Sequence, residues 1–190
     1  MKRLVPALIL LLLLIGSVFF AQWRLQQTTI PELYEVPDFE FKSHLGNTYT
    51  NENFNDKITV ANFIFTNCPG ICPVMSRKMA VIYEKYETQK DVQFVSFSVD
   101  PERDSLQALI EYAENWGVAD QRWQFLKTEK EAIETLYENG FKLGGELPRG
   151  HSGAFVLIDE NGVIRGYYNY EEEESLTLLN EHIDHLKNNL

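Results

Sequence analysis

The sequence predicts an α/β domain with one central mixed sheet, preceded by a single N-terminal membrane-spanning helix. β-prone apolar runs alternate with stretches of helical periodicity from residue 58 onward. Two late β-prone runs are joined by the turn sequence DENG at 159–162, and a long apolar run follows Lys2 and Arg3. The alternation favours parallel strands joined by right-handed crossovers, and the late hairpin adds an antiparallel edge.

Each expected strand is a short run rich in β-branched and aromatic residues. In chain order the strands are residues 38–41, 48–50, 58–65, 92–99, 123–126, 154–158 and 163–168. Each expected helix repeats apolar residues at helical spacing. The helices are residues 73–86, 105–116, 128–140 and 175 onward. A capping box at Thr128 and Glu131 should open the third helix, and Gly140 should close it. This order is typical of a thioredoxin-like sandwich.

Composition excludes several classes of protein. The chain has 190 residues, with 17 Lys and Arg against 28 Asp and Glu, for a formal charge of −11. Such an acidic chain lacks the basic footprint that general nucleic-acid binding requires, so we expect no nucleic-acid partner. Two cysteines are too few for a disulfide-dense scaffold or a four-cysteine zinc site. The sequence also lacks a Gly-rich phosphate loop, a GxSxG motif and an HExxH motif.

We expect residues 1–24 to form a membrane anchor. The apolar run from Leu4 to Ala21 would cover roughly 27 Å as a helix, close to the hydrocarbon thickness of a bilayer. The alternative is a signal peptide cleaved after Ala21. No cysteine stands directly after the run, so lipoprotein processing is not supported. Lys2 and Arg3 should stay in the cytoplasm.

This topology predicts a single-pass protein of the cell inner membrane. Its soluble domain should lie on the periplasmic, extracytoplasmic side. No Arg- and Ser-rich transit peptide precedes the run, which favours a bacterial envelope over a mitochondrion. Residues 25–36 should be a linker and residues 37–190 the thioredoxin-like domain.

Cys68 and Cys72 carry the strongest chemical signal. They follow the first central strand, and Cys72 precedes Pro73 at an expected helix start. The positive end of a helix stabilises a thiolate, so we expect a lowered thiol pKa there. Two such thiols can form a redox pair or bind a soft metal, either copper(I) or zinc with further ligands. A purely structural disulfide is the alternative, but so short a loop gains little stability from one.

Two further residues could join this site. His151 precedes a late strand and could complete a Cys₂His set, although a loop histidine is often simply exposed. Asp100 ends the second central strand and could orient a site residue through a hydrogen bond. The alternative for Asp100 is an ordinary turn and helix cap, shared with Asp104 and Ser105. A second metal site at His182 and His185 is disfavoured.

Three segments in this order resemble the SCO (SenC) family of cytochrome c oxidase assembly proteins. They are FIFTNCPGICPVM at 63–75, FSVDPERDS at 97–105 and HSGAFVLIDENGVI at 151–164. The resemblance implies a thioredoxin fold that binds copper(I) or copper(II) through Cys68, Cys72 and His151. Two departures stand beside the ligands: Gly70, where the family usually has Asp, and Gly150, where a polar residue is common.

The resemblance favours a membrane-tethered copper metallochaperone, and so a protein that is not an enzyme. It would deliver copper to the binuclear copper site of cytochrome c oxidase subunit II. The alternative is a thiol–disulfide reductase that keeps the cysteines of that site reduced, with Cys68 and Cys72 as its catalytic redox pair. Other copper chaperones or thiol–disulfide oxidoreductases would then be further partners. A peroxidase of the same fold is a third, disfavoured hypothesis.

Overall fold

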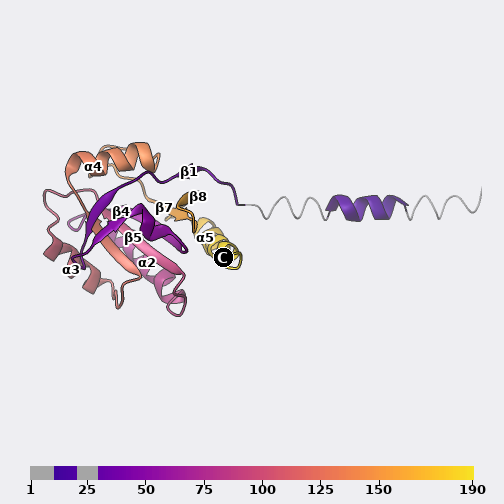
Figure 1. Cartoon of the computed structure of the whole chain (residues 1–190), viewed down its shortest axis with the longest axis horizontal. Coiled ribbons are helices and arrows are strands. Elements are labelled where there is room, and N and C mark those ends of the chain that lie inside the picture. The colour runs from indigo at the N-terminus through magenta and orange to yellow at the C-terminus, as the bar shows by residue number, and fades with distance from the viewer. Residues whose placement is uncertain (1–10, 21–29) are drawn as a thin grey trace, which may run out of the picture. The chain divides into compact units, whose positions relative to one another are not determined.

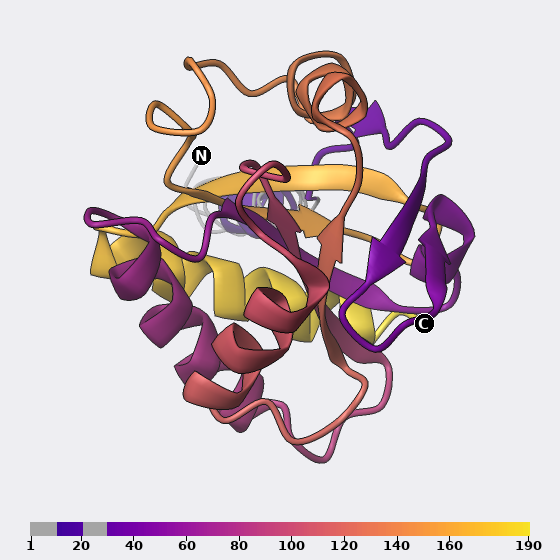
Figure 2. The ribbon, with the colours of Figure 1, turned by 90° about the vertical axis from the view of Figure 1, so that its left-hand side faces the viewer.

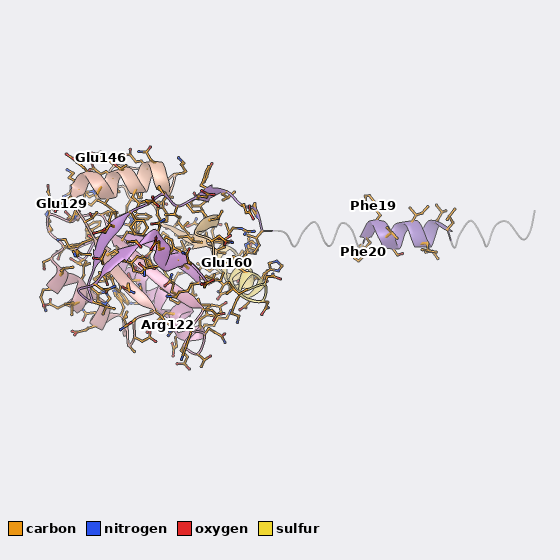
Figure 3. All side chains as sticks on the ribbon, in the orientation of Figure 1. Phe19, Phe20, Arg122, Glu129, Glu146 and Glu160 are labelled. Carbon is orange, nitrogen blue, oxygen red and sulfur yellow. The ribbon has the colours of Figure 1, made fainter. Side chains whose placement is uncertain are left out.

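The structure is a computed structural model that describes residues 11–20 and 30–190. The chain divides into two units, Met1–Pro31 and Glu32–Leu190 (Figure 1). In the first unit, residues 11–20 are helical, and Phe19 and Phe20 point away from the helix (Figure 3). Among the described residues, no helix is long and apolar enough to cross a membrane. The rest of the predicted anchor, residues 1–10 and 21–24, lies outside the described residues, so the anchor stays a prediction.

The second unit is built on a single mixed sheet, as predicted. Its eight strands lie in the order β1-β8-β7-β4-β5-β6-β2-β3. They are β1 (Tyr34–Glu35), β2 (Glu40–Ser43), β3 (Thr48–Thr50), β4 (Ile58–Ile64), β5 (Val92–Ser98), β6 (Trp123–Lys127), β7 (Ala154–Ile158) and β8 (Val163–Asn169). β4, β5 and β6 are parallel, whereas β7 runs antiparallel to β4. The carboxyl end of β4 therefore lies beside the start of β7.

Helices cover both faces of this sheet. They are η1 (Asn51–Phe54), α2 (Cys72–Lys85), α3 (Leu106–Asn115), α4 (Lys130–Thr135), η2 (Leu136–Gly140) and α5 (Glu173–Lys187). α2, α3 and α5 lie on one face, and α4 with η2 lies on the other (Figure 2). This is the sandwich that the order of elements predicted.

β1 lies in the segment expected to be linker. Tyr34 and Glu35 pair with Ile164 and Val163 of β8, so the sheet starts before residue 37. The strand has only two residues and stands between Pro31 and Pro37. A run this short has no alternation to detect, which explains why sequence patterning misses it.

The third predicted helix begins later than expected. α4 starts at Lys130 with Glu129 as N-cap, and no side chain caps it, so the predicted Thr128 capping box is wrong. The helical segment does end at Gly140, but for a packing reason. A Cβ there would lie 2.9 Å from Leu136 Cδ1 and 3.0 Å from Pro37 Cδ. Gly140 does not have the positive φ typical of a glycine that ends a helix. At this helix end the positive φ, 52°, belongs to Lys142.

An aromatic cluster fills the face of the sheet under α4 and η2. Phe97 of β5 is fully buried and stacks on Phe63 of β4, with ring centroids 5.1 Å apart. Its ring also contacts those of Phe39, Phe41 and Phe141, at 5.7, 6.0 and 5.3 Å. Phe97 therefore joins the central strands to the N-terminal hairpin and to the end of η2.

Candidate metal centre

The two cysteines lie on either side of the turn from β4 into α2. Cys68 sits in the loop, where its backbone N–H donates to Phe65 O at 3.3 Å. Cys72 is the first residue of α2 and is fully buried, whereas Cys68 is half-buried. Both are free thiols. The half-buried Cys68 and the buried Cys72 thus occupy the carboxyl edge of the sheet, where α/β proteins commonly bind ligands.

His151 reaches the same point from the opposite end of the sequence. It lies three residues before β7, the antiparallel neighbour of β4, and is only 4% exposed. Its Nε2 is 3.1 Å from Cys72 Sγ, and the ring packs edge-on against Phe65. The structure thus brings His151 to the cysteines and leaves it buried. Among the described residues, Cys68, Cys72 and His151 form the only group of metal-ligating side chains, with donor atoms within 4.8 Å of one another.

Burial sets the protonation state of Cys72 and His151. It raises the pKa of the Cys72 thiol well above its ordinary value, while contacts with the backbone of Phe65 and Cys72 act in the opposite direction. The expectation of a lowered pKa at Cys72 is therefore wrong, because desolvation outweighs the helix end. Burial also lowers the pKa of His151, and the hydrogen bond with the Ser152 backbone acts against that shift. Both groups are therefore neutral near pH 7.

The hydrogen bonds of the imidazole define its tautomer. Nδ1 of His151 is 3.2 Å from Ser152 O, and a carbonyl oxygen can only accept a hydrogen bond. Nδ1 therefore carries the proton, and Nε2 presents a lone pair to the thiol of Cys72. A metal ion would replace the thiol proton at this point, because thiolate and neutral imidazole are the ligating forms.

The donor set fits a soft or borderline metal ion. Metal–sulfur and metal–nitrogen bonds of about 2.3 and 2.0 Å allow donors on one ion to lie up to about 4.6 Å apart. The three donor atoms lie within 4.8 Å of one another, so they need to move only slightly closer together to bind one ion. Two thiolates and one imidazole suit copper in either common oxidation state.

Asp100 borders the cleft above these donors. A cleft of about 410 Å³ is lined by residues of the Cys68 loop together with His151, Asp100, Arg103 and Arg149. The Asp100 carboxylate is largely buried and accepts a hydrogen bond from Arg103 Nη1 at 3.2 Å. Asp100 thus faces the expected edge, and its partner in the structure is Arg103. Its role in orienting a site residue stays a prediction.

Asp104 supports the cysteine loop, a role that the sequence pattern did not predict. Its fully buried carboxylate accepts from Thr66 Oγ1 and Ser98 Oγ, each at 2.6 Å, and from Thr66 N–H at 3.2 Å. Ser105, rather than Asp104, caps α3. Asp104 therefore anchors the chain two residues before Cys68 to the end of β5. One signal in the sequence could have indicated this contact: Thr66 and Asp104 each follow a central strand, and the carboxyl ends of parallel strands lie at the same edge of the sheet.

Two of the three remaining histidines, His44 and His182, have hydrogen-bond partners, whereas His185 is exposed. His44 Nδ1 accepts from Phe125 N–H at 3.1 Å, and His182 Nδ1 lies 2.6 Å from Tyr168 Oη.

Known proteins resemble this chain in sequence and in fold. The sequence model of the SCO1/SenC family matches residues 27–186. The chain belongs to the SCO1/SenC family. An SCO1 protein homologue of Bacillus subtilis is 34% identical over 151 residues, covering 76% of this chain and 78% of that protein. BsSco, a member of the Sco family of cytochrome c oxidase assembly proteins with an identified disulfide switch, is 30% identical with a TM-score of 0.74; the match covers 84% of this chain and 96% of that one. A Stutzerimonas stutzeri protein named for copper binding is 25% identical; the match covers 73% of this chain and 71% of that protein.

The difference in burial predicts that the two thiols react unequally. In the reduced, metal-free protein, iodoacetamide should modify Cys68 at least about tenfold faster than Cys72, because burial limits access and disfavours the thiolate of Cys72. Mass spectrometry of timed digests measures both rates. Cys68→Ser and Cys72→Ser are the matched controls. Equal rates, or faster labelling of Cys72, would contradict the burial seen here.

Proposed function

We propose that this SCO1/SenC protein is a copper metallochaperone that binds one copper ion through Cys68, Cys72 and His151. It would pass that ion to the binuclear copper site of cytochrome c oxidase subunit II. The observation that carries the proposal is the meeting of two sulfurs and one imidazole nitrogen within 4.8 Å. The relatives named for copper binding and for oxidase assembly support it.

Each ligand has a distinct part in holding the ion. The two thiolates suit copper(I), and the imidazole adds a donor that copper(II) favours. Cys68 is the most accessible donor, so a partner's ligand would approach the ion on its side, through the cleft that it lines. Loading releases the proton of Cys72, because its thiol is protonated in the metal-free protein.

The cellular setting belongs to the same proposal. Residues 1–24 would anchor the protein in the inner membrane, residues 25–36 would form the tether and residues 37–190 the periplasmic domain. The apolar side chains over residues 11–20 are exposed, as a lipid-facing segment requires. Other copper chaperones or thiol–disulfide oxidoreductases would load or reduce the site.

A thiol–disulfide reductase is the second candidate, favoured by two neighbouring free thiols of unequal exposure. The Cys68 thiolate would attack a partner disulfide and form a mixed disulfide, releasing one partner thiolate. Cys72, after losing its proton, would attack Cys68 and release the second partner thiolate. The partner leaves as a dithiol, and Cys68 and Cys72 remain as a disulfide.

Copper titration of the full chain in detergent separates the two functions. We expect one copper per wild-type chain, with sulfur-to-copper(II) charge-transfer absorption. His151→Ala should lower copper(II) affinity by more than about 100-fold, since it removes a ligand rather than an outer-shell partner. His185→Ala, an exposed histidine on α5, is the matched control and should bind as wild type does.

The reductase makes the opposite prediction for the same variant. Copper binding that is weak and indifferent to His151, with disulfide reduction retained in His151→Ala, would overturn the chaperone and support the reductase. Loss of copper binding in both Cys68→Ser and Cys72→Ser is required by the chaperone.

A further inference from the structure

The segment that carries His151 folds back on itself before it enters β7. Residues 141–153 contain no helix or strand, and Glu146 lies at the edge of the domain (Figure 3). Gly150 N–H donates to Glu146 O at 2.6 Å. A Cβ on Gly145 would lie 1.9 Å from Gly150 O, so the two sides of the loop are in direct contact. The loop therefore has a narrow neck immediately beside His151.

The phenol of Tyr137 closes that neck. Its hydroxyl donates to Gly144 O at 2.7 Å and accepts from Ser152 N–H at 2.7 Å. The side chain is fully buried in η2, and its ring meets that of Phe63 edge-on with centroids 4.9 Å apart. Phe63 belongs to β4, the strand that leads to Cys68. One hydroxyl thus ties both sides of the histidine loop to the strand that bears the cysteines.

These bonds continue to the imidazole. The N–H that Tyr137 holds belongs to the peptide between His151 and Ser152, and the carbonyl of Ser152 accepts from His151 Nδ1 at 3.2 Å. Fixing Ser152 therefore fixes the acceptor that selects the tautomer of the ring. The same arrangement points Nε2 at Cys72 Sγ.

We propose that Tyr137 is a positioning residue for His151, whose hydroxyl holds the His151–Ser152 peptide so that Nε2 faces the two sulfurs. The copper part of this inference rests on the proposed function. Copper(II) gains more from the imidazole than copper(I) does, because two thiolates already satisfy copper(I). Loss of the hydroxyl should therefore weaken copper(II) binding more than copper(I) binding.

The first test uses the metal-free full chain in detergent. Tyr137→Phe removes the hydroxyl and keeps the ring on Phe63. It leaves the Ser152 N–H without its partner, so Ser152 amide exchange should become about tenfold faster or more. Long-range ¹H–¹⁵N spectra of His151 should show the Nδ1–H tautomer in wild type and a mixture in the variant. A general loss of stability would accelerate exchange throughout the domain, whereas this effect is confined to the loop.

Tyr167→Phe is the matched control. Its hydroxyl donates to Phe141 O at 3.0 Å, so the variant loses a similar phenol–carbonyl bond at the far end of the same loop. The exchange rate of Ser152 and the tautomer of His151 should stay as in wild type. If both variants change Ser152 equally, the effect is general loosening and the assignment of Tyr137 is overturned.

The second test measures copper affinity in the same variants. Tyr137→Phe should lower copper(II) affinity by about 10- to 100-fold, the usual cost of removing an outer-shell partner, with a smaller loss for copper(I). Unchanged exchange, tautomer and affinity would overturn the proposal. If wild type binds no copper, the proposed function fails while the metal-free measurements still decide the role of Tyr137. If Tyr137→Phe does not fold, an unprotected Ser152 amide in wild type overturns the inference and a protected one supports it.

Discussion

Replacing Asp104 with alanine should lower the free energy of unfolding by about 3–5 kcal/mol. The substitution removes a fully buried carboxylate and leaves three donors without their acceptor, namely the N–H and hydroxyl of Thr66 and the hydroxyl of Ser98. Each buried donor left unpaired costs about 1–3 kcal/mol. Urea unfolding at pH 7, followed by circular dichroism, measures the loss.

Two further variants separate these bonds from simple charge removal. Asp104→Asn keeps one acceptor oxygen and the shape of the side chain, so its loss should fall between wild type and Asp104→Ala. Asp120→Ala removes a half-exposed carboxylate paired with Arg122 and should cost less than about 1 kcal/mol. A loss below about 1 kcal/mol in Asp104→Ala would contradict the anchoring role given to this carboxylate.

Phe97→Ala should be comparably destabilising, by about 3–5 kcal/mol. The fully buried ring contacts four other aromatic rings from β4, the N-terminal hairpin and the residue after η2, so its removal opens a cavity at the centre of this face. The urea midpoint should fall while the slope of the transition stays unchanged. Val81→Ala, at a position 64% exposed, is the control and should change stability by less than about 0.5 kcal/mol. Similar values for the two variants would show that Phe97 is not central to packing.

Much of the fold could be predicted from hydrophobic patterning. The runs 58–65 and 92–99 become the central parallel strands β4 and β5, where every residue of each strand is buried. Local patterning failed where long-range contacts decide the structure. β1 exists because β8 offers it hydrogen bonds, and Gly140 is required because Pro37 packs against it. Neither contact leaves a trace in the residues nearby.

The ligand candidates were predictable, but the groups that hold them were not. Residue types and their positions at strand ends singled out Cys68, Cys72 and His151, which the structure brings together. The helix start suggested an acidic thiol at Cys72, yet complete burial reverses the direction of the pKa shift. Asp104 and Tyr137 act through hydrogen bonds to residues distant in sequence or in irregular loops, and a single sequence does not reveal such pairings.

The antiparallel pairing of β7 with β4 also orders events during biosynthesis. The imidazole is translated 79 residues after Cys72, so a growing chain exposes two thiols long before its third donor exists. That donor reaches the sulfurs only when β7 docks beside β4. Under the proposed function, three-ligand copper binding would thus be restricted to chains in which β7 has paired with β4, and fragments truncated before residue 151 would offer only the two thiols. The position of one histidine would thereby make copper retention depend on a chain that has folded through β7.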